Sequence, residues 1–160
     1  MKLSCFFHVP FWMAVCVMLT TGRVNAAPAD ALHMEVQLIW ATNETSTKHK
    51  PIDADFAKRL GKTYRWKNYY EISQQAVSIP NGAVNTIKMS DQCKLDVKYL
   101  GGDRVEIVLT GEGKPVSKHV EKLALDWPLV LSGNAKNETA WLVVIKKVAA
   151  DKAAKSEKAK

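Results

Sequence analysis

The chain has 160 residues and a formal net charge of +7 at pH 7. Much of this excess lies at the two ends, which leaves about +3 on the body of the chain, an ordinary value for a soluble domain. The charge therefore does not indicate a specific nucleic-acid partner, and the length is sufficient for one compact domain but too short for two.

The first 26 residues have the features of a cleaved export signal. Lys2 provides a positive start, residues 3–19 are almost wholly apolar, and Ala26 is the small residue after which we expect cleavage. A retained membrane helix is the alternative, but the segment contains His8 and Pro10 and is barely long enough to span a bilayer. We therefore expect an exported protein, periplasmic or secreted, with no stable membrane span after cleavage.

The cysteine content excludes a disulfide framework within the mature chain. Cys5 and Cys16 leave with the predicted signal, so Cys93 alone remains. An exported domain without an internal disulfide depends on its hydrophobic core for stability. We expect Cys93 to be a buried small apolar residue, and pairing between two chains is the alternative.

The first element of the mature chain is predicted to be a strand. Apolar and polar residues alternate over residues 33–40, which is typical of a half-buried strand. Residues 41–50 are polar and without periodicity, so they indicate an exposed loop. Asn43 in this loop and Asn137 near the C-terminus begin Asn-Glu-Thr sequences, which are glycosylation sites in a eukaryotic secretory chain and have no such meaning in a bacterium.

The one clear helix signal follows this loop. Asp53 is placed to cap the first turn, and Ile52, Phe56 and Leu60 form an apolar stripe with a spacing of four. Gly61 is expected to end the helix in the left-handed conformation. A helix of two turns has little stability of its own, so we expect Phe56 and Leu60 to hold it against a sheet.

An aromatic cluster comes directly after the predicted helix, within the stretch of residues 60–79. In a strand, Trp66 and Tyr70 would share one face, with Arg65, Lys67 and Tyr69 on the other. We expect Trp66 and Tyr70 to be core residues, because small β domains bury their largest rings. The opposite row, Arg65, Lys67 and Tyr69, is then the candidate binding surface for a protein or polysaccharide partner.

Two further segments predict a strand and a hairpin. Residues 83–90 follow an Asn-Gly turn and have a strand pattern, and residues 93–110 contain the clearest alternation in the chain. If the apolar faces of this hairpin coincide, the residues opposite one another are Tyr99 and Val105, Val97 and Ile107, and Leu95 and Leu109. This register requires an odd number of loop residues, either Gly101-Gly102-Asp103 or five residues, in place of a two-residue Gly-Gly turn.

The last part of the domain predicts three more strands. Pro115 cannot donate a hydrogen bond, so residues 115–120 are expected at a sheet edge. Pro128 interrupts a long alternating run and makes residues 129–131 a short separate strand. Residues 140–145 are apolar on both faces, which predicts a strand covered on each side.

These elements together predict a mainly β fold. We expect an antiparallel β-sandwich or partly open barrel of about eight strands with one short helix, formed by a single domain over residues 27–149. Residues 150–160 contain only Ala, Lys, Asp, Ser and Glu and are expected to be a disordered tail.

The residue inventory does not indicate a catalytic or metal site. There is no Gly-x-Ser-x-Gly sequence, and His33, His49 and His119 fall in three different predicted elements. Cys93 lies on the apolar face of its strand, where a thiol is usually inert, and one cysteine with three separated histidines lacks the paired spacing of zinc ligands. Asp53 is explained by the helix start. We therefore predict no catalytic residues, no metal and no cofactor.

Three stretches give the chain a resemblance to small exported bacterial proteins of unassigned function. They are residues 38–43, residues 62–72 with the core Trp66-Lys67-Asn68-Tyr69-Tyr70, and residues 133–141. The resemblance covers most of the mature domain and implies a bacterial-envelope setting. It implies no catalytic residues.

The leading functional hypothesis is an exported, non-catalytic β domain that binds a protein or an envelope polymer, or that serves as a structural accessory. The alternative is a small hydrolase or a hydrolase inhibitor, which would need a cleft where His49 or His119 meets an acidic residue. The sequence does not indicate the oligomeric state.

Overall fold

The computed structural model describes residues 31–46, 48–134 and 138–149. The predicted export signal, the lysine-rich tail and Asn137 lie outside these residues. Within the described part of the chain, no helix is both long enough and apolar enough to cross a membrane.

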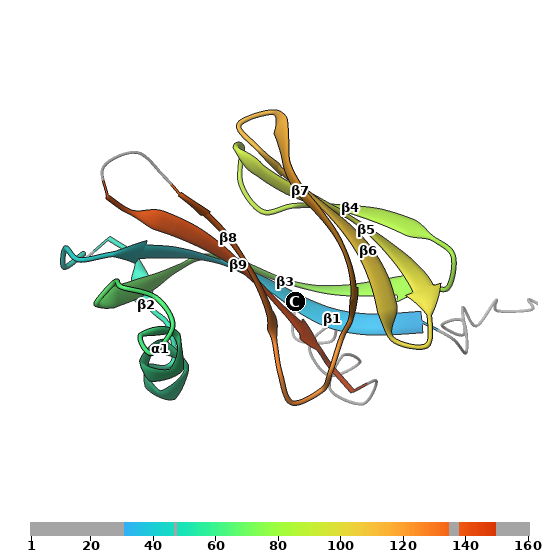
Figure 1. The fold of residues 1–160 in the computed structure, drawn as a ribbon, viewed down its shortest axis with the longest axis horizontal. Helices are drawn as coiled ribbons and strands as arrows, with labels where there is room; N and C mark the ends of the chain where they lie inside the picture. The colour runs from blue at the N-terminus through green and yellow to red at the C-terminus, as the bar shows by residue number, and fades with distance from the viewer. Residues whose placement is uncertain (1–30, 47, 135–137, 150–160) are drawn as a thin grey trace, which may run out of the picture.

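Two antiparallel sheets face each other in the structure (Figure 1). The five-stranded sheet has the order β2-β3-β1-β9-β8, and the four-stranded sheet has the order β4-β5-β6-β7. The elements are β1 (Ala31–Thr42), β2 (Lys50–Pro51), α1 (Ala54–Leu60), β3 (Asn68–Pro80), β4 (Val84–Lys88), β5 (Cys93–Gly101), β6 (Arg104–Gly111), β7 (Lys114–Lys122), β8 (Leu129–Asn134) and β9 (Ala140–Lys147). The predicted mainly β class with one short helix is confirmed. The described residues form nine strands, one more than the roughly eight predicted, in two antiparallel sheets and without a closed barrel.

The main core lies between the two sheets. Every second residue of the central strands points into it, as the alternating sequences of β1, β5 and β6 predicted. Its fully buried members include Met34 and Val36 from β1, Leu95 and Val97 from β5, Val105, Ile107 and Leu109 from β6, and Val143 and Ile145 from β9. Cys93 belongs to the same core, which confirms its predicted burial, and burial raises the pKa of its thiol.

A second, smaller core lies on the opposite face of the five-stranded sheet. There, α1 covers Ile39 and Ala41 of β1 and Leu142 and Val144 of β9 with the side chains of Phe56 and Leu60. The central strand β9 is therefore covered on both faces, which is why its sequence is apolar without alternation. The predicted covered strand is confirmed.

The helix begins as predicted and ends differently. The Asp53 side chain accepts a hydrogen bond from the Phe56 backbone N–H at 2.9 Å, which is the expected cap. Gly61, however, has a φ of −64°, so the prediction of a left-handed end is wrong. The chain continues through further turns, in which the Tyr64 N–H donates to the Leu60 carbonyl at 2.8 Å, and no reversal is needed.

The β5–β6 hairpin has the predicted register: Tyr99 pairs with Val105 and Leu95 with Leu109. The loop is built differently from the expected three-residue loop. A register shift between Tyr99 and Gly101 accommodates the odd residue, and Gly102 and Asp103 then form a two-residue turn. Both turn residues have positive φ, 59° and 67°, as a type I′ turn requires.

The β7 strand lies at an edge of the four-stranded sheet, as predicted from Pro115. The β8 strand forms after Pro128 and lies at an edge of the five-stranded sheet, paired with β9. The connection between β7 and β8 passes from one sheet to the other, and it contributes to the site described below.

Candidate functional site

The aromatic stretch after α1 is divided between the second core and the opposite face of β3. Trp66 is buried and its indole N–H donates to the Glu138 carbonyl at 3.0 Å. Tyr70 is also buried and lies opposite Trp40, with ring centroids 5.9 Å apart. The predicted burial of Trp66 and Tyr70 is therefore confirmed, but the prediction that they share one face is wrong, because Trp66 belongs to the second core and Tyr70 does not. β3 begins only at Asn68, so the strand does not include Trp66.

The predicted binding row of Arg65, Lys67 and Tyr69 does not form one exposed surface. Arg65 and Lys67 are exposed, and the Arg65 guanidinium lies 5.4 Å from the Trp66 ring centroid. Tyr69, in contrast, is only 4% exposed. The expectation that Tyr69 points to solvent is wrong, because α1 covers the face of β3 on which it lies.

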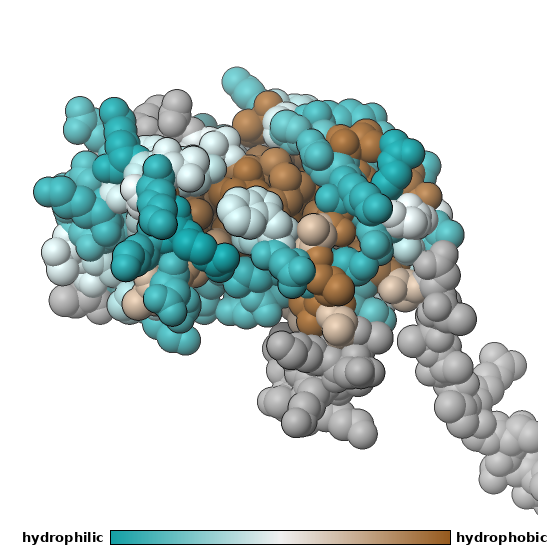
Figure 2. Space-filling view, turned by 60° about the horizontal axis from the view of Figure 1, so that its bottom comes forward, coloured by the Kyte–Doolittle hydropathy of each residue, from teal (hydrophilic) through white to brown (hydrophobic). Residues whose placement is uncertain are grey.

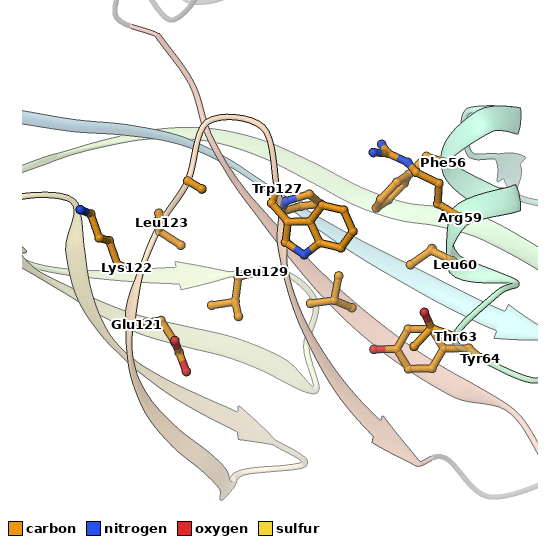
Figure 3. Close-up of a pocket in the computed structure, with 13 residues that line it drawn as sticks. Phe56, Arg59, Leu60, Thr63, Tyr64, Glu121, Lys122, Leu123, Trp127 and Leu129 are labelled. Carbon is orange, nitrogen blue, oxygen red and sulfur yellow. The ribbon is translucent and has the colours of Figure 1, made fainter.

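A pocket of about 460 Å³ lies between α1, the β7–β8 connection and the start of β8 (Figure 3). Phe56, Arg59 and Leu60 of α1 form one side, followed by Thr63 and Tyr64. Glu121 and Lys122 at the end of β7 and the following connection form the other side. Figure 3 shows Trp127 between these two sides, near Phe56.

Most of the pocket lining is apolar. The apolar and aromatic members are Phe56, Leu60, Tyr64, Leu123, Ala124, Trp127, Pro128, Leu129 and Val130. The space-filling view of this side of the molecule shows hydrophobic side chains gathered in the middle of the face, with hydrophilic side chains on either side (Figure 2). This combination of an apolar interior and a polar border is common in binding sites.

Trp127 is the most exposed large apolar side chain of the described residues, at 73%. Leu125, two residues earlier, is 57% exposed. The alternation of residues 123–131 indicated a strand that bends at Pro128, but residues 123–128 form an irregular connection. An exposed tryptophan is unusual, because its ring contributes a large apolar area whose removal from water is favourable.

The charged groups around the pocket are mostly basic. The Arg59 guanidinium lies 5.4 Å from the Phe56 ring centroid, and the Lys146 ammonium lies 4.9 Å from it. Such cation–π contacts keep both positive charges beside the apolar wall. In the lining itself, Arg59 and Lys122 are the cations and Glu121 is the one acidic residue. Lys146 lies outside the lining, and its ammonium is 3.8 Å from the Glu35 carboxylate.

Tyr69 lies in the second core, behind the pocket wall. Its hydroxyl oxygen is buried and has no hydrogen-bond partner among the described residues. Burial, and to a smaller degree the charge of Tyr64, raise the pKa of Tyr69 above its ordinary value of 10.0. The side chain therefore stays neutral and contributes mainly an apolar ring to the core.

The histidines lie apart from one another and from this pocket. His49 is exposed and its ring lies 5.9 Å from that of Trp40, whereas His119 is half-buried on the edge strand β7. Within the described residues, neither one has a hydrogen bond or ion pair with a carboxylate, and no cluster of His, Cys, Asp or Glu could hold a metal ion. No paired histidine and acid thus supports the hydrolase hypothesis in this part of the chain.

Comparisons of the chain with protein-family models, with curated proteins and with solved structures find no match. The resemblance to small exported bacterial proteins therefore remains a prediction.

One feature of the sequence points to the pocket, namely the proline that follows Trp127. Leu125, Trp127 and Leu129 belong to an alternating run, and Pro128 interrupts this run directly after the tryptophan. A proline next to an aromatic residue in a connecting segment favours an irregular, exposed backbone. The helix side of the pocket had no such signal, because Phe56 and Leu60 were already explained by core packing.

Proposed function

We propose that this protein is an exported, non-catalytic domain that binds a partner protein at the pocket between α1 and the β7–β8 connection. The observation that carries the proposal is Trp127, which is 73% exposed at the border of an apolar pocket. Clustered exposed apolar side chains with a polar border are characteristic of protein-binding sites.

The composition of the site supports a protein partner. Tryptophan and arginine are the residues that most often dominate the binding energy of protein interfaces, and both Trp127 and Arg59 border the pocket. A partner side chain inserted beside Trp127 would remove that ring, which is 73% exposed, from water. The volume of about 460 Å³ is sufficient for one or two large apolar side chains.

The test begins with the protein expressed with its own N-terminus, purified and exposed to envelope extracts. Captured proteins are purified singly, and their dissociation constants are measured by calorimetry for the wild type and for Trp127→Ser. We expect the substitution to weaken binding by about tenfold or more, as removal of a central aromatic anchor does.

Val84→Ser is the matched control, because Val84 is 62% exposed on β4, which does not line the pocket. It should leave the affinity unchanged. Equal affinities of the wild type and Trp127→Ser would contradict the proposal, as would the absence of any micromolar protein partner. Oligosaccharides are measured in parallel, and Trp127-dependent binding of these alone would identify a polysaccharide-binding domain in its place.

A further inference from the structure

The two sheets have edges that differ in how they are protected from additional strands. Beyond β2, the edge of β3 lies beside β4 of the other sheet. The Ser73 hydroxyl donates to the Met89 carbonyl at 2.7 Å, and the Gln75 amide donates to the Lys88 carbonyl at 2.6 Å. These two hydrogen bonds connect β3 of one sheet with the end of β4 and the residue after it in the other.

The edge strand β7 has several features that oppose pairing with another chain. Pro115 lacks a backbone N–H, and a register shift between Leu109 and Thr110 bends the strand at Val116. The same strand carries three lysines, at positions 114, 118 and 122. Proline, bulges and lysines are the devices by which natural sheets avoid edge-to-edge association.

The edge strand β8 lacks every one of these features. Its sequence, Leu-Val-Leu-Ser-Gly-Asn, has no charged residue and no proline within the strand. It pairs with β9 from Leu129 to Asn134 without a register shift. Within the described residues, β8 has no backbone hydrogen bonds except those to β9. The backbone N–H and C=O groups at its outer edge therefore form no pair with any described residue.

The same strand begins in the wall of the pocket. Leu129 and Val130 are the first residues of β8 and also line the pocket, next to Trp127. A strand that paired with the outer edge of β8 would thus pass beside the pocket. Because side chains of a strand alternate, one of its residues would face the apolar lining while its backbone formed hydrogen bonds with β8.

We propose that the partner contributes an extended segment that pairs with β8 and inserts an apolar side chain into the pocket. The inference rests on the proposed function and names the partner's chemistry: a β-strand with a large apolar residue and a neighbouring acidic residue. The unpaired backbone groups of β8 recognise a peptide backbone in particular. The cations Arg59 and Lys122 outnumber Glu121 in the lining, which favours a carboxylate beside the apolar side chain.

The probe for this proposal is a random dodecapeptide library displayed on phage and selected on the purified full chain. Peptides that bind the wild type and not Trp127→Ser are synthesised. Each is then methylated on one backbone nitrogen at a time, which removes one N–H donor without changing any side chain. We expect a period of two along the peptide, with losses of about tenfold or more at alternate positions and little change between them.

Hydrogen exchange provides a second measurement on the unmodified protein. Binding of a selected peptide should slow exchange at alternate amides of residues 129–133, while the amides of β7, an edge strand of the other sheet, should not change. The β7 amides thus serve as the internal control.

Several outcomes separate the two proposals. Peptides that depend on Trp127 but tolerate methylation at every position, or that leave β8 exchange unchanged, would overturn strand pairing and leave the proposed function intact. A library without any Trp127-dependent peptide would count against both. A stable dimer in which the β8 amides are protected without peptide would overturn the partner segment in favour of a second copy of this chain.

Discussion

Gly133 lies directly opposite Trp141 in the β8–β9 pair, and the indole ring fills the space above the glycine. A Cβ atom at position 133 would overlap ring atoms of Trp141. We therefore expect Gly133→Ala to lower the free energy of unfolding by about 1–3 kcal/mol, the usual cost of overpacking. Denaturant titration measures the change.

Gly61→Ala is the control for this substitution. Gly61 has a φ of −64°, and a Cβ atom added there would lie 3.4 Å from the Ala57 carbonyl oxygen, an ordinary contact. Alanine fits there and restricts the unfolded chain, so stability should be unchanged or rise by about 0.4–1 kcal/mol. A Gly133→Ala protein as stable as Gly61→Ala would show that Trp141 moves aside at little cost.

Removing the hydroxyl group from each of two neighbouring tyrosines is expected to have opposite effects on stability. Tyr69 has a buried hydroxyl without a partner in the described residues, whereas the Tyr70 hydroxyl accepts a hydrogen bond from the Ser46 N–H at 2.8 Å. Tyr69→Phe should therefore maintain stability or raise it by about 1 kcal/mol, and Tyr70→Phe should lower it by about 1 kcal/mol. Thermal unfolding of the two variants in the same buffer provides the comparison.

An alkaline titration adds a further test of Tyr69. Its pKa is raised in the folded protein, so the unfolded chain loses this proton first as the pH rises above about 10. The stability contributed by the protonated hydroxyl is present below that pH and declines above it. Tyr69→Phe should show a smaller decline than the wild type, and an identical decline would contradict the buried, neutral state of this side chain.

Helix α1 is the element on which both the second core and the pocket depend. Asp53→Ala removes the hydrogen bond to Phe56 N–H and should lower the free energy of unfolding by about 1 kcal/mol. Asp53→Asn is the control, since an amide oxygen also caps a helix. If the two variants have equal stability, the cap does not contribute.

The elements that were predicted correctly are those for which two independent features of the sequence agree. The β5–β6 register followed from two alternating segments that had to share one buried face, and α1 from a cap that agreed with its apolar spacing. The end of α1 was missed because Gly61 permits the left-handed conformation without requiring it. The prediction that Tyr69 is exposed was wrong because both faces of β3 are covered near the start of the strand. α1 covers the face that carries Tyr69, and Trp40 contacts Tyr70 on the other face.

At the scale of the whole molecule, the assignment of strands to sheets and the pocket itself could not be predicted from the sequence. The Asn81–Gly82 turn looks like that of a hairpin, yet β3 and β4 belong to different sheets. The pocket joins α1 to the start of β8, which are about 70 residues apart in the chain. Local patterns indicate which residues are buried, whereas the meeting of distant elements depends on packing.

The β7–β8 connection leaves the four-stranded sheet at Lys122 and enters the five-stranded sheet at Leu129. One wall of the pocket is therefore the β7–β8 connection, and the opposite wall is α1, which packs on the five-stranded sheet. A ligand bound in the pocket would contact the β7–β8 connection and α1 at the same time, and would therefore connect the two sheets. Its binding energy would add to the resistance of the two sheets to separation, and occupancy would be visible as a higher melting temperature of the entire sandwich.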